Sequence, residues 1–80
     1  MPTIFVKKGF RYHFYSNEGD EPAHVHVTGN GGEMKVWLKP IYVENVYRVS
    51  PKDQRVILTN IKENIAILLE KWNEFASRKK

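Results

Sequence analysis

The sequence predicts an α+β domain: a small antiparallel sheet of three to five strands with one long C-terminal α-helix packed on one face. Up to residue 49, apolar and polar residues alternate through several short segments, as they do in half-buried strands. After residue 50, apolar residues recur every three or four positions, as on one side of a helix. With 80 residues and no internal repeat or linker, we expect one domain over 1–80, with strands in 1–49 and a helix over 50–78.

The strands follow one another along the first half of the chain. β-Branched and aromatic residues indicate the first strand, a Lys8-Gly9 turn follows it, and alternation indicates the next strands. The run Gly29-Asn30-Gly31-Gly32 predicts a tight hairpin, since positive φ costs glycine and asparagine little. The predicted strands are Thr3–Lys7, Phe10–Tyr15, Ala23–Thr28 and Glu33–Lys39, the last of which ends at Pro40.

A helix is predicted to begin after Ser50, which suits the N-cap position, with Pro51 at the first helical position. Asp53 adds a favourable charge to the first turn. One apolar stripe runs along this helix to about residue 77, through Ile57, Ile61, Ile65, Leu68, Trp72 and Phe75.

Alternation divides the strand residues between two faces. We expect the helix to cover the face with Phe10, Tyr12, Phe14, Val25, Val27, Met34, Val36 and Leu38. The opposite face would carry Arg11, His13, Tyr15, His24, His26, Lys35 and Trp37. No second helix remains in the sequence to cover this basic, aromatic and histidine-bearing face, so its chemistry decides the functional interpretation.

Composition excludes several classes. There is no cysteine, hence no disulfide and no thiolate metal site. The apolar start of the chain is shorter than the apolar core of a signal peptide, because Lys7 and Lys8 follow it closely. No apolar run is as long as a membrane-spanning helix, so we expect a cytoplasmic protein with no membrane contact. A net charge of +4 points only weakly to polyanions, because three of the positive charges lie in the last four residues.

The pair His24 and His26 is the most informative feature, because side chains two apart on a strand stand side by side. With Glu18 orienting an imidazole, the pair could serve as the acid and base of a metal-independent ribonuclease. The contacts to RNA would come from Arg11, His13, Tyr15, Lys35 and Trp37, as phosphate-binding and base-stacking groups. The plain alternative is a set of exposed polar side chains on a solvent-facing sheet.

Metal binding is a competing interpretation of the same pair. His24 and His26 could chelate zinc or copper, with oxygen ligands from Glu18, Asp20 or Glu21. No further spaced cluster completes such a site, and the neighbouring cations disfavour a divalent metal ion. We therefore expect no metal and no other cofactor.

Residues 41–49 fit either a short strand or an irregular connection. Tyr42, Val43, Val46 and Tyr47 are apolar without clear periodicity, and they could form an edge strand that pairs with another chain. A domain of this size hides only about 60–65% of its unfolded surface, so a partner or a second copy would add stability.

Several sequence blocks resemble one family. They are Met1–Phe5, Gly9–Arg11, Phe14–Glu18, Glu21-Pro22 with His24–Val27, Trp37-Leu38 with Pro40, Ile61, Glu63-Asn64, and Glu70 with Trp72–Phe75. These blocks are similar to small bacterial proteins catalogued as domain of unknown function 4160. The shared polar and aromatic positions are Arg11, Tyr15, Ser16, Asn17, Glu18, Glu21, His24, His26, Trp37 and Trp72.

The resemblance implies the toxin-like role in a two-gene module of the toxin–antitoxin type, beside a small partner of the domain of unknown function 2442 family. It assigns no catalytic residue. One departure is that Arg48-Val49-Ser50 stands where the family usually has a glycine-containing turn before the helix.

By fold analogy alone, a small basic toxin with a histidine-bearing sheet and one helix also suggests ribonuclease toxins of the double-stranded-RNA-binding type. The leading hypothesis is therefore a toxin-like protein that binds RNA and could also cleave it. The alternative is a non-enzymatic module that binds its partner protein.

Overall fold

The computed structural model describes residues 3–14 and 22–78 of the chain. Five strands come first: β1 (Thr3–Lys7), β2 (Phe10–His13), β3 (His24–Gly29), β4 (Gly32–Leu38) and β5 (Ile41–Tyr47). Two helices follow, α1 (Pro51–Glu63) and α2 (Ile65–Arg78). The predicted α+β class with an antiparallel sheet is confirmed, and the ambiguous segment after Pro40 is a strand.

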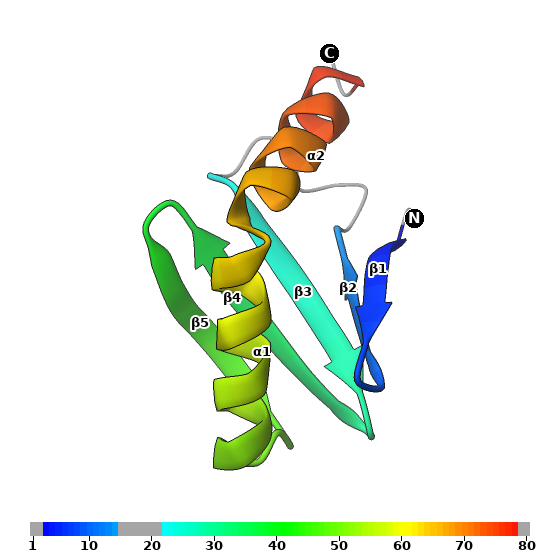
Figure 1. The fold of residues 1–80 in the computed structure, drawn as a ribbon, viewed down its shortest axis with the longest axis vertical. Coiled ribbons are helices and arrows are strands. Elements are labelled where there is room, and N and C mark those ends of the chain that lie inside the picture. Colours follow the sequence, from blue (N-terminus) through cyan, green and yellow to red (C-terminus); the bar gives the residue numbers. More distant parts are fainter. Residues whose placement is uncertain (1–2, 15–21, 79–80) are drawn as a thin grey trace.

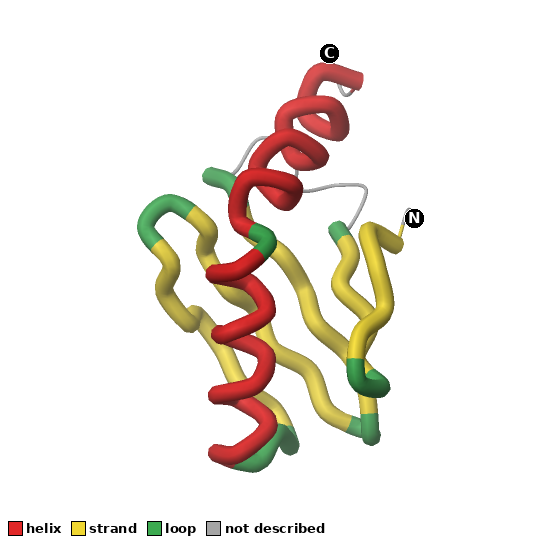
Figure 2. The backbone as a smooth tube through the Cα atoms, viewed as in Figure 1, coloured by secondary structure: helices red, strands yellow, loops and turns green. Residues whose placement is uncertain are grey.

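The five strands form one sheet in the order in which they occur along the chain, and each pairs antiparallel with its neighbour. β1 and β5 are therefore the two edge strands. Both helices lie on the same side of this sheet, and α2 runs on past one end of it (Figure 1). The loops gather at the two ends of the strands (Figure 2).

Two hairpin turns hold their central residues in the left-handed region. Lys8 and Gly9 have φ of 54° and 84° between β1 and β2, and Asn30 and Gly31 have φ of 51° and 78° between β3 and β4. Positive φ at both central residues is the geometry of a type I′ turn, whose twist matches that of the flanking strands. The turns predicted at these two places are confirmed.

The core lies between the sheet and the helices. Alternate residues of β2, β3 and β4 are buried against Ile57 and Ile61 of α1 and Leu68 and Trp72 of α2. Near its middle, Asn60 donates a hydrogen bond from Nδ2 to the Tyr12 hydroxyl, at 3.2 Å. The predicted apolar face of the sheet is thus the face that the helices cover.

The helical region differs from the single helix predicted, because it divides at Asn64. The N-terminal end is as expected, since the Ser50 hydroxyl accepts a hydrogen bond from the Asp53 backbone N–H at 3.1 Å. At the division, Asn64 has φ −117° and ψ 21°, and its Nδ2 donates to the Asn60 carbonyl at 2.8 Å. The Asn64 backbone N–H donates to the same carbonyl at 3.1 Å and to the Ile61 carbonyl at 3.2 Å, so the chain is bonded to the end of the first helix while its backbone departs from helical geometry. Within the described residues, neither helix is long and apolar enough to cross a membrane.

Candidate functional site

The strand register gathers most of the predicted site residues on the sheet face opposite the core. His13 pairs with His26, which in turn pairs with Lys35, and His24 pairs with Trp37. Directly opposed residues of antiparallel strands project to the same side. Arg11 of β2 shares this face, because it lies two residues before His13.

The three histidines are buried, although we predicted that this face would be uncovered. The exposed fractions of His13, His24 and His26, the histidine cluster, are 7%, 0% and 5%. Their rings contact one another: the centroids of His13 and His26 are 6.1 Å apart, and those of His24 and His26 are 5.2 Å apart. The sequence-based expectation failed here because alternation tells which side chains share a face and not how much of that face is covered.

Part of the cover over His24 comes from the helical region. The Trp72 ring of α2 lies 4.8 Å from the His24 ring and 5.0 Å from the Phe14 ring, between centroids. His24 also donates from Nδ1 to the backbone carbonyl of Pro22, at 2.9 Å. Because a carbonyl only accepts, the hydrogen atom sits on Nδ1 in the neutral ring. Trp72 therefore serves both the core and the histidine cluster.

Electrostatics favours the neutral imidazole at His13. Burial lowers the pKa of His13, and the nearby His26 lowers it further, whereas Glu33 partly opposes the shift. His26 Nδ1 lies 3.5 Å from a Glu33 carboxylate oxygen, and His13 Nε2 lies 3.3 Å from the Thr28 hydroxyl. Buried rings that pack on one another leave little surface for an anion, so this geometry does not favour the phosphate site that we expected on this face.

We expect the stability of the protein to fall as pH falls below the ordinary histidine pKa of 6.5, in part because of His13. A lowered folded-state pKa means that the unfolded chain binds the proton more tightly, so this contribution is present above the unfolded-state pKa and lost on acidification. Thermal unfolding of wild type and His13→Gln between about pH 7.5 and 5.5 measures the effect. The variant should show the smaller decrease in Tm, since carboxylates titrate alike in both proteins. An equal decrease in both would contradict the prediction.

Trp37, predicted to stack on RNA bases, already has partners within the chain. Its indole Nε1 donates to a Glu44 carboxylate oxygen at 2.6 Å, and Lys35 Nζ lies 4.6 Å from the ring centroid. Glu44 was not among the predicted site residues. It lies where the β4–β5 register shifts, since Lys35 pairs with Asn45 and Val36 with Val43. No periodicity rule locates such an irregularity, so the sequence could not reveal this contact.

The other described member of this face is Arg11. Arg11 is exposed. Tyr15 and Glu18, with the proposed metal-binding residues Asp20 and Glu21, lie outside the described residues. Within the part of the chain that is described, no three or more histidine, aspartate or glutamate side chains are grouped as a metal ion would require.

The apolar residues predicted to contact a partner lie on β5. The register places Tyr42 opposite Trp37 and Tyr47 opposite Glu33, so both tyrosines project from the face that carries the histidine cluster. Val43 and Val46 pair with core residues of β4 and therefore project to the helix side. Tyr42 and Tyr47 are 63% and 57% exposed.

A basic groove lies outside every predicted site. It has a volume of about 520 Å³ and separates the β1–β2 turn from α1. Four cations line it: Lys7, Lys8, Lys52 and Arg55. The adjacent lysines at the turn and the helical spacing of residues 52 and 55 are visible in the sequence, but their proximity depends on how the helix crosses the sheet.

Comparison with known families agrees with the resemblance seen in the sequence. Residues 9–73 match the family model described as Domain of unknown function (DUF4160). The chain belongs to the DUF4160 family. The family match spans β2 to most of α2, and thus the histidine cluster, β5 and the helical part of the basic groove. No curated protein and no solved structure matches the chain significantly.

Proposed function

We propose that this DUF4160 protein is a binding module, the toxin-like member of a two-protein pair, and that its partner adds a strand to the β5 edge. The small protein of the domain of unknown function 2442 family, which the sequence resemblance implies, is the proposed partner. The observation that carries the proposal is the exposed pair of tyrosines on an edge strand.

The geometry of β5 supports strand addition. One side of the strand pairs with β4, and within the described residues no strand lies on its other side. An unpaired strand edge presents a row of backbone N–H and C=O groups that can bind another strand. β5 spans seven residues, whereas the opposite edge strand β1 spans five and has a register irregularity between Thr3 and Phe5. β5 is therefore the longer platform for a partner.

The side chains of β5 also suit a protein interface. The register shift around Glu44 brings Tyr42 and Tyr47 to one face although they are five positions apart. Tyrosine combines a large apolar ring with a hydroxyl group, and it is enriched at protein interfaces. The Tyr47 ring lies 5.4 Å from the Arg48 guanidinium carbon, which adds a cation beside it. A strand placed along β5 would contact both tyrosines.

Replacing Tyr47 by lysine should weaken partner binding at least about 30-fold, the effect of losing an interface residue worth about 2 kcal/mol. Titration calorimetry with the purified partner measures the affinity. Val6→Lys is the matched control: Val6 is an exposed apolar residue on the opposite edge, and it faces Arg11 across the ladder. That control should bind like wild type.

Hydrogen exchange tests the binding mode directly. In the complex, the backbone amides of residues 41–47 that point away from β4 should exchange more slowly than in the free protein, because a new strand would accept their hydrogen bonds. Formation of no complex, equal weakening by Val6→Lys, or unchanged exchange along β5 would each contradict strand addition at this edge.

RNA cleavage by His24 and His26, with Glu18, stays an untested prediction. The burial of both imidazoles and the hydrogen bond from His24 to Pro22 favour a structural role for the cluster over proton transfer to a substrate.

A further inference from the structure

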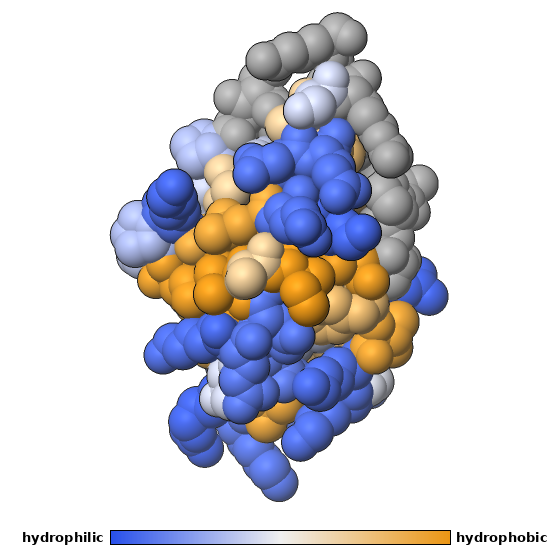
Figure 3. Space-filling model, turned by 45° about the horizontal axis from the view of Figure 1, so that its top comes forward, coloured by the Kyte–Doolittle hydropathy of each residue, from blue (hydrophilic) through white to orange (hydrophobic). Residues whose placement is uncertain are grey.

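The basic groove carries exposed cationic side chains on both of its sides. Its rim carries the exposed side chains of Lys7 and Lys8 on the sheet side and of Lys52 and Arg55 on α1. The other residues that line it are Val56, Thr59, Asn60 and Glu63. The lining therefore contains four cationic side chains and one carboxylate, that of Glu63. Figure 3 shows hydrophilic residues gathered at the lower end of the molecule, below an apolar band, and a second hydrophilic zone above that band.

Local structure brings these cations together. The groove residues of α1 recur at intervals of three or four between Lys52 and Glu63, so they lie on one side of the helix. On the sheet side, Lys8 occupies a turn position with φ 54°, where asparagine or glycine is favoured. Lys8 therefore adds a positive charge beside the groove although the left-handed backbone is unfavourable for lysine.

The floor of the groove is anchored to the core. Asn60 is buried and bonded to the Tyr12 hydroxyl of β2, which fixes α1 against the sheet beneath the cations. Burial raises the pKa of Tyr12, although its bond with Asn60 opposes the shift, so this hydroxyl stays neutral and adds no negative charge. The groove is thus a positively charged surface that is tied to the core through Asn60.

We propose that this groove binds the phosphodiester backbone of a nucleic acid. Lysine and arginine are the side chains that contact phosphate oxygens, and such contacts are independent of base sequence. None of the residues that line the groove is aromatic, so it offers no stacking platform for bases. The site differs from the sheet face first predicted to bind RNA, and it does not depend on the protein partner proposed for β5.

Fluorescence anisotropy with a labelled single-stranded RNA of about 20 nucleotides tests the proposal at several salt concentrations. If four cations neutralise phosphates, log K against log salt has a slope of about −2.8, which is an affinity loss of about 50-fold from 50 to 200 mM salt. Single-stranded DNA of the same sequence, a second RNA sequence and a duplex are the comparison probes.

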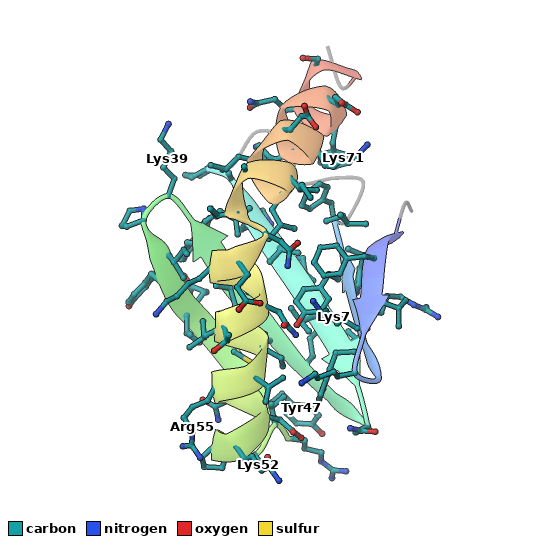
Figure 4. The ribbon with its side chains drawn as sticks, viewed as in Figure 1. Lys7, Lys39, Tyr47, Lys52, Arg55 and Lys71 are labelled. Carbon is teal, nitrogen blue, oxygen red and sulfur yellow. The ribbon has the colours of Figure 1, made fainter. Side chains whose placement is uncertain are left out.

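The double variant Lys52→Glu/Arg55→Glu should lose at least about tenfold in affinity and show a shallower salt slope. Its control is Lys39→Glu/Lys71→Glu, which changes the net charge equally. In Figure 4, Lys39 and Lys71 lie at the upper end of the molecule, while Lys52 and Arg55 lie at the lower end. Acidic residues in the first turns of α1 favour a helix, so the groove variant should keep its Tm.

Binding of RNA and DNA strands with similar affinity, lost only in the groove variant, is the expected result. Equal loss in both double variants would reduce the effect to net charge and overturn the groove as a site. Absence of salt-dependent binding by wild type, or a strong preference among base sequences, would overturn backbone recognition.

Discussion

Trp72→Ala should destabilise the protein by about 3–5 kcal/mol, the cost of removing a large buried aromatic side chain. Trp72 is buried, and its ring contacts those of Phe14, Phe75 and His24. A domain of 80 residues has a free energy of unfolding of only about 4–12 kcal/mol, so the substitution removes a large fraction of that stability. Thermal unfolding should show Tm lower by at least about 12 °C.

The control for this change is Ile67→Ala on the same helix. Ile67 is an exposed apolar residue, so its truncation should cost about 1 kcal/mol or less. Trp72→Phe keeps a ring in the site and should lie between the two. If Trp72→Ala lowered Tm no more than Ile67→Ala, the contact between α2 and the histidine cluster would not contribute to stability as the structure indicates.

Gly32→Ala should also destabilise the protein strongly, by about 3 kcal/mol or more. A Cβ atom at this position would overlap the Arg48 carbonyl oxygen and would lie 2.8 Å from that of Tyr47. Both obstacles are backbone atoms, so no side-chain rotation relieves the clash. The segment between β5 and α1 must shift, which would also displace Tyr47 and weaken partner binding.

Gly31→Ala separates this effect from ordinary turn strain. Gly31 has φ 78° and open space where an alanine methyl group would lie, so alanine there costs only the left-handed backbone penalty of about 1–2 kcal/mol. Denaturant unfolding of the two variants gives both values. A smaller loss for Gly32→Ala than for Gly31→Ala would show that the backbone near Arg48 yields easily to an added methyl group.

Much of the fold follows from local patterns in the sequence. The alternation in β2, β3 and β4 separates two sheet faces, and glycine with asparagine predicts the β3–β4 turn. Ser50 and Pro51 mark the start of α1, and the apolar stripe continues through both helices. These signals depend on residues close together in the chain, which is why sequence patterns contain them.

The features that the sequence did not predict are local departures from regular geometry or depend on distant contacts. The division at Asn64 interrupts an unbroken apolar stripe, and it lies where the Asn60 carbonyl accepts from both the backbone N–H and the side chain of Asn64. The register shift that pairs Trp37 with Glu44 depends on how β5 joins β4. The burial of the histidine cluster depends partly on where α2 places the Trp72 ring against His24. For the candidate site, residue types and shared faces were therefore predictable, whereas the exposure of the side chains was not.

The sequential order of the strands has a consequence for folding. Each strand pairs only with its neighbours along the chain, so the sheet can form by successive hairpin closures of low contact order, which favours rapid folding. The apolar face of that sheet gains its cover only when α1 and α2 dock, and these segments are synthesised after the strands. During synthesis the strands are therefore available before the helices that cover their apolar side, and the time until the helices dock sets how long that face is open to aggregation or to a chaperone.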